Sequence, residues 1–145
     1  MNHRGAVTHR AHSARCVSRR REIQAAYVFG SVATGRARAD SDVDVAVLVD
    51  PRKPRLRGLD YQLDLMADLG AALHRPDIDV VLLNDATPLL AHRVLSQGVL
   101  VFERSATARV RFQVRTAARC LDLVPMFETY IRYSKRRPQR DATRG

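Results

Sequence analysis

The sequence predicts an α/β fold, in which a small mixed β-sheet carries helices packed on one face and a helical segment follows at the C-terminal end. The first observation is that short apolar runs of strand length alternate with longer segments whose apolar residues recur at helical spacing. The second is that Gly and Pro residues separate these segments. With 145 residues, the chain is one domain of ordinary size with room for one core.

Two strands flank a Gly-rich turn near the start of the domain. An apolar run at 27–29 stops at Gly30, and a second run, with valine at every other position, covers 43–49. Side chains alternate across a strand, so these valines should share one face while the residues between them share the other. Pro51 and Pro54 then break the sheet.

A helix should follow, because apolar residues recur at helical spacing over 56–73. This stripe consists of Leu56, Leu59, Leu63, Met66 and Leu73. We expect it to cover the sheet as part of the core. Asp60, Asp64 and Asp68 also recur at every fourth position. That acidic row is most simply the solvated face, the alternative being contact with an arginine-rich partner or with the chain's own basic tail.

The second half of the domain continues the alternation of strands and helices. A third strand is expected where Asp79 precedes an apolar run at 80–83. Thr87 and Pro88 match a helix N-cap followed by proline at the first helical position. A glycine ends this short helix before an edge strand at 99–102.

The final helix and the two ends complete the organisation of the chain. Ser105 can cap a final helix, which Pro125 should kink or interrupt. The chain then divides into a basic lead-in at 1–21, expected to be disordered or weakly helical, a domain at 22–134 and a basic tail at 135–145.

Charge is distributed unevenly along the chain. The formal net charge is +10, yet residues 22–103 carry 8 Lys and Arg against 12 Asp and Glu. Residues 1–21 hold six arginines and no acid, and residues 104–145 hold eleven basic residues against three acidic ones. The basic ends would attract a polyanion by counterion release, so weak nucleic-acid contact is one interpretation, and solvated ends are the other.

Cysteine usage and hydropathy indicate the compartment. Cys16 and Cys120 stand far apart with no Cys-x-x-Cys or histidine pattern, so both should be free thiols. No apolar run approaches the roughly 20 residues that span a bilayer, and the N-terminal residues lack the apolar core of a signal peptide. We therefore expect a cytoplasmic protein without a membrane partner.

The most informative motif is Gly30-Ser31, followed after ten residues by Asp42-x-Asp44. Gly30 lets the backbone approach a phosphate closely, and Ser31 adds a hydroxyl and an N–H. Asp42 and Asp44 point to one face of their strand, where two carboxylates repel each other unless a cation lies between them. Mg²⁺ prefers carboxylate and phosphate oxygens, so the motif predicts a site for a nucleoside triphosphate and magnesium.

A third carboxylate is expected, because nucleotidyl transfer uses a pair of metal ions about 3.5–4 Å apart. Asp79 is the candidate, since it begins the third predicted strand and could lie beside the first pair. It would bind the ion that activates the acceptor hydroxyl. Asp77 shares its face, but it follows Pro76, where a solvated residue is expected, and we rank it well below Asp79.

Other polar residues near the motif have an ordinary structural explanation. Arg36 and Arg38 lie in the loop between the motif halves, where they either touch phosphates or, as is usual for loop arginines, are solvated. Ser41 either orients the first aspartate or merely starts the strand. His74 and His92 have no matching partners in the sequence and are expected to be structural.

These residues resemble the DNA-polymerase-β-type nucleotidyltransferase superfamily, whose signature is Gly-Ser, a spacer, Asp-x-Asp and a distant third Asp. Within it, the pattern resembles the minimal nucleotidyltransferase (MNT) antitoxins that are paired with HEPN toxins. The likeness includes LVD after the dyad, the DVVLLN strand and TPLLAHRVLSQGVLVFE, and it spans roughly residues 25–133. It implies the DNA polymerase beta-like nucleotidyltransferase fold, with 22–134 as the minimal nucleotidyltransferase domain.

The resemblance also implies an activity, cofactors and a partner. Gly30 and Ser31 would contact the triphosphate of ATP, Asp42 and Asp44 would hold two Mg²⁺ ions, and Asp79 would complete the catalytic and metal site. Members of this group are understood to transfer AMP from ATP to a tyrosine hydroxyl of the cognate HEPN toxin, which neutralises it. A hetero-oligomer with the toxin is therefore expected.

Two rival functions belong to other classes. The chain could be a non-catalytic antitoxin that neutralises its toxin by binding alone, or a nucleic-acid binder that acts through its basic ends. Antibiotic-modifying relatives are disfavoured, because only about 40 residues follow Glu103, too few for an added acceptor-binding domain. A partner protein could close the acceptor site instead.

Overall fold

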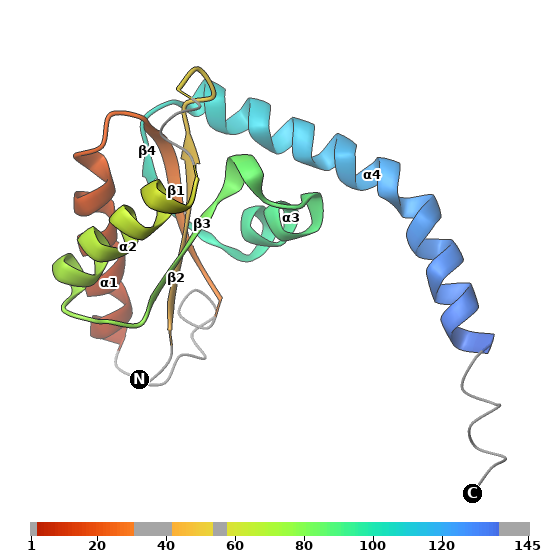
Figure 1. Cartoon of the computed structure of the whole chain (residues 1–145), viewed down its shortest axis with the longest axis horizontal. Helices are drawn as coiled ribbons and strands as arrows, with labels where there is room; N and C mark the ends of the chain where they lie inside the picture. The colour runs from red at the N-terminus through yellow and green to blue at the C-terminus, as the bar shows by residue number, and fades with distance from the viewer. Residues whose placement is uncertain (1–2, 31–41, 54–57, 137–145) are drawn as a thin grey trace, which may run out of the picture.

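The computed structural model describes residues 3–30, 42–53 and 58–136. One sheet holds four strands in the order β3-β2-β1-β4 (Figure 1). Their bounds are β1 Ile23–Phe29, β2 Val43–Val49, β3 Ile78–Leu82 and β4 Val99–Glu103. Strand β1 pairs antiparallel with β2 and with β4, whereas β2 pairs parallel with β3. The predicted α/β class, the mixed sheet and the edge strand β4 are confirmed.

Helices cover both faces of this sheet, which corrects the expectation that they pack on one. Helices α1 His3–Ser18 and α2 Leu59–Leu73 lie on one face, while α3 Pro88–Gln97 and the start of α4 Ala106–Arg136 lie on the other (Figure 1). The reason is that the central strands are apolar on both sides. Val45 belongs to the core under α1 and α2, whereas Tyr27 and Ala46 belong to the core under α3.

The buried face of α2 differs from the predicted stripe. Leu59 and Leu63 are exposed, at 68% and 51% of their surfaces. The buried row consists of Tyr61, Leu65, Leu69 and Leu73. Of the predicted stripe, Leu73 is buried, Met66 packs partly against the core, and Leu56 lies outside the described residues. Leucines occupy two faces of this helix, and spacing alone does not decide which face meets the sheet.

The N-terminal segment is a helix that packs on the domain, where a disordered or weakly helical lead-in was expected. Within α1, Val17 is completely buried in the core and Ser13 is also buried. Arg20 follows the helix and forms ion pairs with Asp64 and Asp68 of α2. Part of the predicted acidic row therefore meets an arginine of the N-terminal segment, which compensates its charge.

The C-terminal elements begin as predicted and end differently. Thr87 caps α3 by accepting a hydrogen bond from the Leu90 N–H, and Ser105 accepts one from the Ala108 N–H at 3.1 Å at the start of α4. Helix α4 continues through Pro125, so of the predicted kink or interruption the interruption does not occur. A proline removes one backbone donor, but the hydrogen bonds of neighbouring turns remain. Figure 1 shows the second half of α4 leaving the body of the domain.

Two chain-wide expectations can be compared with the fold. Both cysteines, Cys16 and Cys120, are free thiols, as predicted. Within the described ranges, no helix combines the length and the apolar character that crossing a membrane requires.

Candidate active site

Strand pairing brings two of the predicted carboxylates together. Asp44 is the second residue of β2, Asp79 is the second residue of β3, and the parallel register makes them direct Cα partners. Paired residues of neighbouring strands project on the same side of a sheet. That side is the α3 face, because Ala46 and Val81 from the same faces of β2 and β3 pack there. Asp42 directly precedes β2, so all three carboxylates lie at one end of the sheet, which we call the acidic end.

Gly30, directly after β1, also lies at the acidic end. It follows β1, whose last residue, Phe29, pairs with Asp44. Its φ is +73°, in the left-handed region that favours glycine. A Cβ at this position would lie 2.2 Å from Asp44 Oδ2. Only glycine leaves space for that carboxylate where β1 turns away from the sheet.

The electrostatics of the acidic end favour a bound cation. The pKa of Asp44 is raised, chiefly because the side chain is half-buried and secondarily because Asp79 and Asp42 are close. Arg93 of α3 acts in the opposite direction. Asp42 and Asp79 are themselves exposed. The site thus has one sheltered carboxylate and two that face solvent, where a ligand can reach them.

The donor set fits magnesium. Carboxylate oxygens are hard ligands, and Mg²⁺ commonly takes only one or two carboxylates, completing its octahedron with waters and substrate phosphates. Among the described residues, no three Asp, Glu, His or Cys side chains already converge as a cage.

Two arginines at the acidic end were missed by the sequence analysis. The charge of Arg93 acts on Asp44, and the charge of Arg75 acts on Asp42. Neither belongs to the motif, and only the folding of α3 and of the turn before β3 brings them near it. Basic side chains here can bind the non-metallated oxygens of a polyphosphate.

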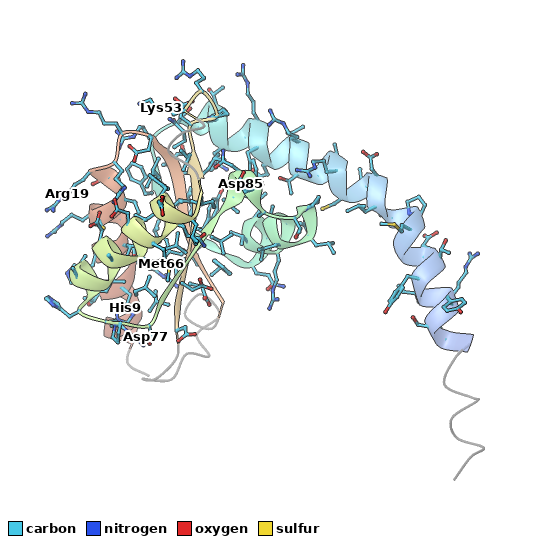
Figure 2. All side chains as sticks on the ribbon, in the orientation of Figure 1. His9, Arg19, Lys53, Met66, Asp77 and Asp85 are labelled. Atoms are coloured by element: carbon cyan, nitrogen blue, oxygen red, sulfur yellow. The ribbon has the colours of Figure 1, made fainter. Side chains whose placement is uncertain are left out.

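Asp77 has a structural role that the sequence did not reveal. Its carboxylate accepts hydrogen bonds from Arg75, with Nε to Oδ1 at 2.9 Å, and these bonds lower its pKa. Its backbone carbonyl accepts from the Val43 N–H at 2.9 Å, which fastens the start of β2 beside β3. Figure 2 places His9 of α1 beside Asp77, and burial, followed by the charge of Arg75, lowers the pKa of that histidine. Asp77 is thus partly buried and paired, rather than solvated.

Several sequence predictions fall on residues that the structure does not describe. Ser31, Arg36, Arg38 and Ser41 lie outside the described ranges, so their roles stay predictions.

A family model described as polymerase beta, nucleotidyltransferase, matches residues 14–107, which is more than half of the chain. A curated relative, protein adenylyltransferase MntA of Aphanizomenon flos-aquae (strain 2012/KM1/D3), is 34% identical over 93 residues. That match covers 61% of this chain and 62% of the relative, so the chain spans less than two thirds of the relative's length.

Solved structures share the fold. One, described as the crystal structure of a toxin-antitoxin with AMP-PNP, aligns with a TM-score of 0.73 at 24% identity, covering 87% of this chain and 98% of the other. Another, described as a tri-AMPylated Shewanella oneidensis HEPN toxin in complex with MNT antitoxin, aligns with a TM-score of 0.66 at 21% identity, covering 88% and 98%.

Proposed function

The chain belongs to the polymerase beta nucleotidyltransferase family, and from that membership we propose that it is a Mg²⁺-dependent adenylyltransferase antitoxin. It transfers AMP from ATP to a tyrosine hydroxyl of a cognate HEPN toxin and thereby neutralises the toxin. The observation that carries this proposal is the register of β2 and β3, which makes Asp44 and Asp79 neighbours at the end of the sheet that Gly30 reaches.

Each residue of the acidic end has a defined role in the proposed reaction. Asp42 and Asp44 hold two Mg²⁺ ions, and Asp79 shares one of them. When bound, the ions neutralise phosphate oxygens and lower the pKa of the acceptor hydroxyl. Gly30 leaves the backbone open for the triphosphate, together with the predicted contact from Ser31. Because Asp79 is exposed, it lies on the side from which a protein acceptor can enter.

The bond changes balance without a covalent enzyme intermediate. The tyrosine oxygen forms a bond to the α-phosphorus of ATP, and the bond from that phosphorus to the bridging oxygen of the β-phosphate breaks. Pyrophosphate leaves with the electron pair, and the phenolic proton passes to Asp79 or to solvent. The protein contributes position and charge, which are the main requirements of nucleotidyl transfer.

The comparisons support the nucleotide and the acceptor. The 34% identical relative is named a protein adenylyltransferase. Among the structures with the same fold, one is described with an ATP analogue and one with an AMPylated HEPN toxin. ATP as the donor and a HEPN protein as the acceptor agree with both descriptions.

The test is the intact mass of the cognate HEPN toxin after incubation with this protein, ATP and Mg²⁺. We expect gains of whole AMP units with the wild type. The Asp42→Asn/Asp44→Asn variant should be slower by about 1,000-fold or more, because it removes metal ligands worth several kcal/mol.

A matched control is the Asp60→Asn/Asp122→Asn variant, which removes the same charge from exposed positions on α2 and α4. It should transfer AMP like the wild type. If the toxin instead stays unmodified in a stable complex, and the Asp42→Asn/Asp44→Asn variant neutralises it equally well, the protein acts by binding alone and the proposal is wrong.

A further inference from the structure

A hollow lies at the end of the sheet opposite the acidic end. It has a volume of about 510 Å³ and is lined by the start of β1, the end of β2, and the first half of α4. Asp50, on its wall, is six residues along β2 from Asp44, which corresponds to about 20 Å of extended strand. In Figure 2, Lys53 marks this end of the molecule and Asp77 marks the other. We call this hollow the basic pocket.

Three arginines of α4 line the basic pocket. Arg111, Arg115 and Arg119, which we call the arginine row, stand at intervals of four and therefore on one side of the helix. All three are exposed, and none has a hydrogen bond or ion pair with any residue in the described part of the chain. Like charges at this spacing repel each other, so an anion bound to the arginine row would relieve that repulsion.

Other arginines of the domain behave differently. Arg20 pairs with carboxylates of α2, and Arg109, on the same helix as the arginine row, pairs with Glu103. Arg52 lines the pocket too, but it is bound to Asp50, with Nη2 to Oδ2 at 3.0 Å. Arg52 thus neutralises the charge of Asp50, and the arginine row leaves the pocket with a net positive charge.

A threonine hydroxyl is also available in the pocket wall. Thr116 is only 4% exposed as a residue and lines the pocket between two members of the arginine row. Its oxygen is not one of the buried side-chain atoms that lack a partner, so it is accessible from the hollow. A hydroxyl there can donate a hydrogen bond to a polar ligand.

The remaining walls suit an aromatic ring and keep the pocket open. Phe112 is partly buried and offers ring surface to the hollow, as in sites where bases stack on aromatic side chains. Asn84 is part of the scaffold, because its amide exchanges two hydrogen bonds of 2.8 Å with the backbone of Val49. The first turn of α4 also faces the hollow and adds the positive end of its helix dipole.

We propose that the basic pocket is a second, metal-independent binding site for the phosphate and base of a nucleotide, either a free nucleotide or a unit of single-stranded RNA. Guanidiniums and a hydroxyl bind the phosphate, and Phe112 contacts the base. This site is separate from the acidic end, where three carboxylates repel a phosphate unless cations are present. It would also locate any nucleic-acid contact in the first half of α4, within the basic segment 104–145.

The test is fluorescence anisotropy of a labelled ten-nucleotide oligoadenylate with the full-length protein in EDTA, with unlabelled ATP and AMP as competitors. We expect saturable binding that the arginine-row variant, with all three arginines changed to glutamine, weakens by about tenfold or more. Thr116→Val, which keeps the shape of the side chain, should weaken binding by about threefold to tenfold.

The control removes the same charge elsewhere, in the variant Arg21→Gln/Arg132→Gln/Lys135→Gln, whose three side chains are exposed outside the pocket. It should bind much more tightly than the arginine-row variant. Competition by ATP and AMP would identify free nucleotides as the ligand, and binding of the oligonucleotide without such competition would identify RNA. Equal weakening by both triple variants, or no saturable binding, would overturn the proposal.

This outcome is independent of the catalytic proposal. The Asp42→Asn/Asp44→Asn variant should bind the oligonucleotide in EDTA as the wild type does, because its substitutions lie at the other end of the sheet. Failure of AMP transfer would leave the basic pocket untouched, and failure of oligonucleotide binding would leave AMP transfer untouched.

Discussion

At the end of the sheet where β2 begins, Asp44 and Asp79 are register partners and Asp42 directly precedes the strand, whereas at the end where β2 finishes, the guanidiniums of α4 line a hollow. The acidic end is made by residues of adjacent strands that pair in register. The basic pocket depends on a helix that folds back over the sheet from later in the chain. Opposite charge thus accumulates at two ends of one β-strand pair.

The comparison teaches how one small domain can hold two independent charged sites. Each end is incompletely neutralised, and in opposite senses: the acidic end favours cations, and the basic pocket favours anions. Their separation of about 20 Å along β2 exceeds the Debye length of about 8 Å at physiological ionic strength. Salt therefore screens one site from the other, and substitutions at one end should leave the other unchanged.

The largest expected effect disrupts both ends together, because the sheet that carries them packs on the core under α1 and α2. Leu65 is completely buried, so Leu65→Ala should lower the free energy of unfolding by about 2–5 kcal/mol. Leu63 is 51% exposed, and Leu63→Ala should change it by less than about 0.5 kcal/mol. Urea denaturation measures both. Similar costs for the two variants would contradict the observed orientation of α2.

At the acidic end alone, Asp79→Asn should reduce AMP transfer by about 100-fold or more, because it removes the proposed third metal ligand. Asp77→Asn provides the comparison, since Asp77 is bound to Arg75. Asp77→Asn should lower the rate of AMP transfer by less than about tenfold, because it only loosens the turn before β3. The measurement is the initial rate of toxin modification by each variant. If Asp77→Asn lowered this rate more than Asp79→Asn, the catalytic role would belong to Asp77.

Gly30→Ala should displace the Asp44 carboxylate, because the new Cβ would lie 2.2 Å from Oδ2. We expect AMP transfer per folded molecule to fall by about tenfold or more. Gly58→Ala is the matched control: Gly58 also has a positive φ, of 120°, but a Cβ there meets nothing within 4 Å. Both should lose about 1–3 kcal/mol of stability to backbone strain, and Gly58→Ala should retain its activity. Equal activity of the two variants would refute the proposed contact.

The smallest effect compares two aspartates at opposite ends of β2 in metal-free protein. Burial and neighbouring carboxylates raise the pKa of Asp44, so the folded protein loses stability as pH rises through that group's titration range. Asp44→Asn should therefore stabilise the protein at neutral pH, with a benefit that disappears below the ordinary aspartate pKa of about 3.9.

Asp50 should show the opposite sign. Hydrogen bonds from Arg52 lower its pKa, so its contribution to stability is present at neutral pH and is lost as pH falls through that lowered pKa. Asp50→Asn should therefore destabilise the protein at neutral pH. Thermal denaturation in EDTA from pH 3 to 8 measures both variants. If Asp44→Asn and Asp50→Asn changed the melting temperature at neutral pH in the same direction, the opposite effects of the two carboxylates on stability would be refuted.

The sequence predicted the local elements better than their packing. Valine alternation located β2, and the caps at Thr87 and Ser105 were correct because a cap depends on residues within one turn. The buried side of α2 was predicted wrongly, and α1 was not recognised as part of the core, because both depend on the sheet surface that they cover. A basic, weakly apolar segment such as α1 becomes a stable helix only when it packs.

For the candidate site, the sequence by itself determined which chemical groups are present, because Gly30, Asp42, Asp44 and Asp79 are residue types that suit the proposed triphosphate and magnesium binding. Tertiary structure alone decided their neighbours. The parallel register set Asp79 beside Asp44, and packing of the flanking segments brought Arg93 and Arg75 to the acidic end and the arginine row to the opposite end. The physical reason is the distance over which each property is determined. A motif depends on residues that are close in the sequence, whereas the electrostatic environment of a site depends on charges from the whole fold.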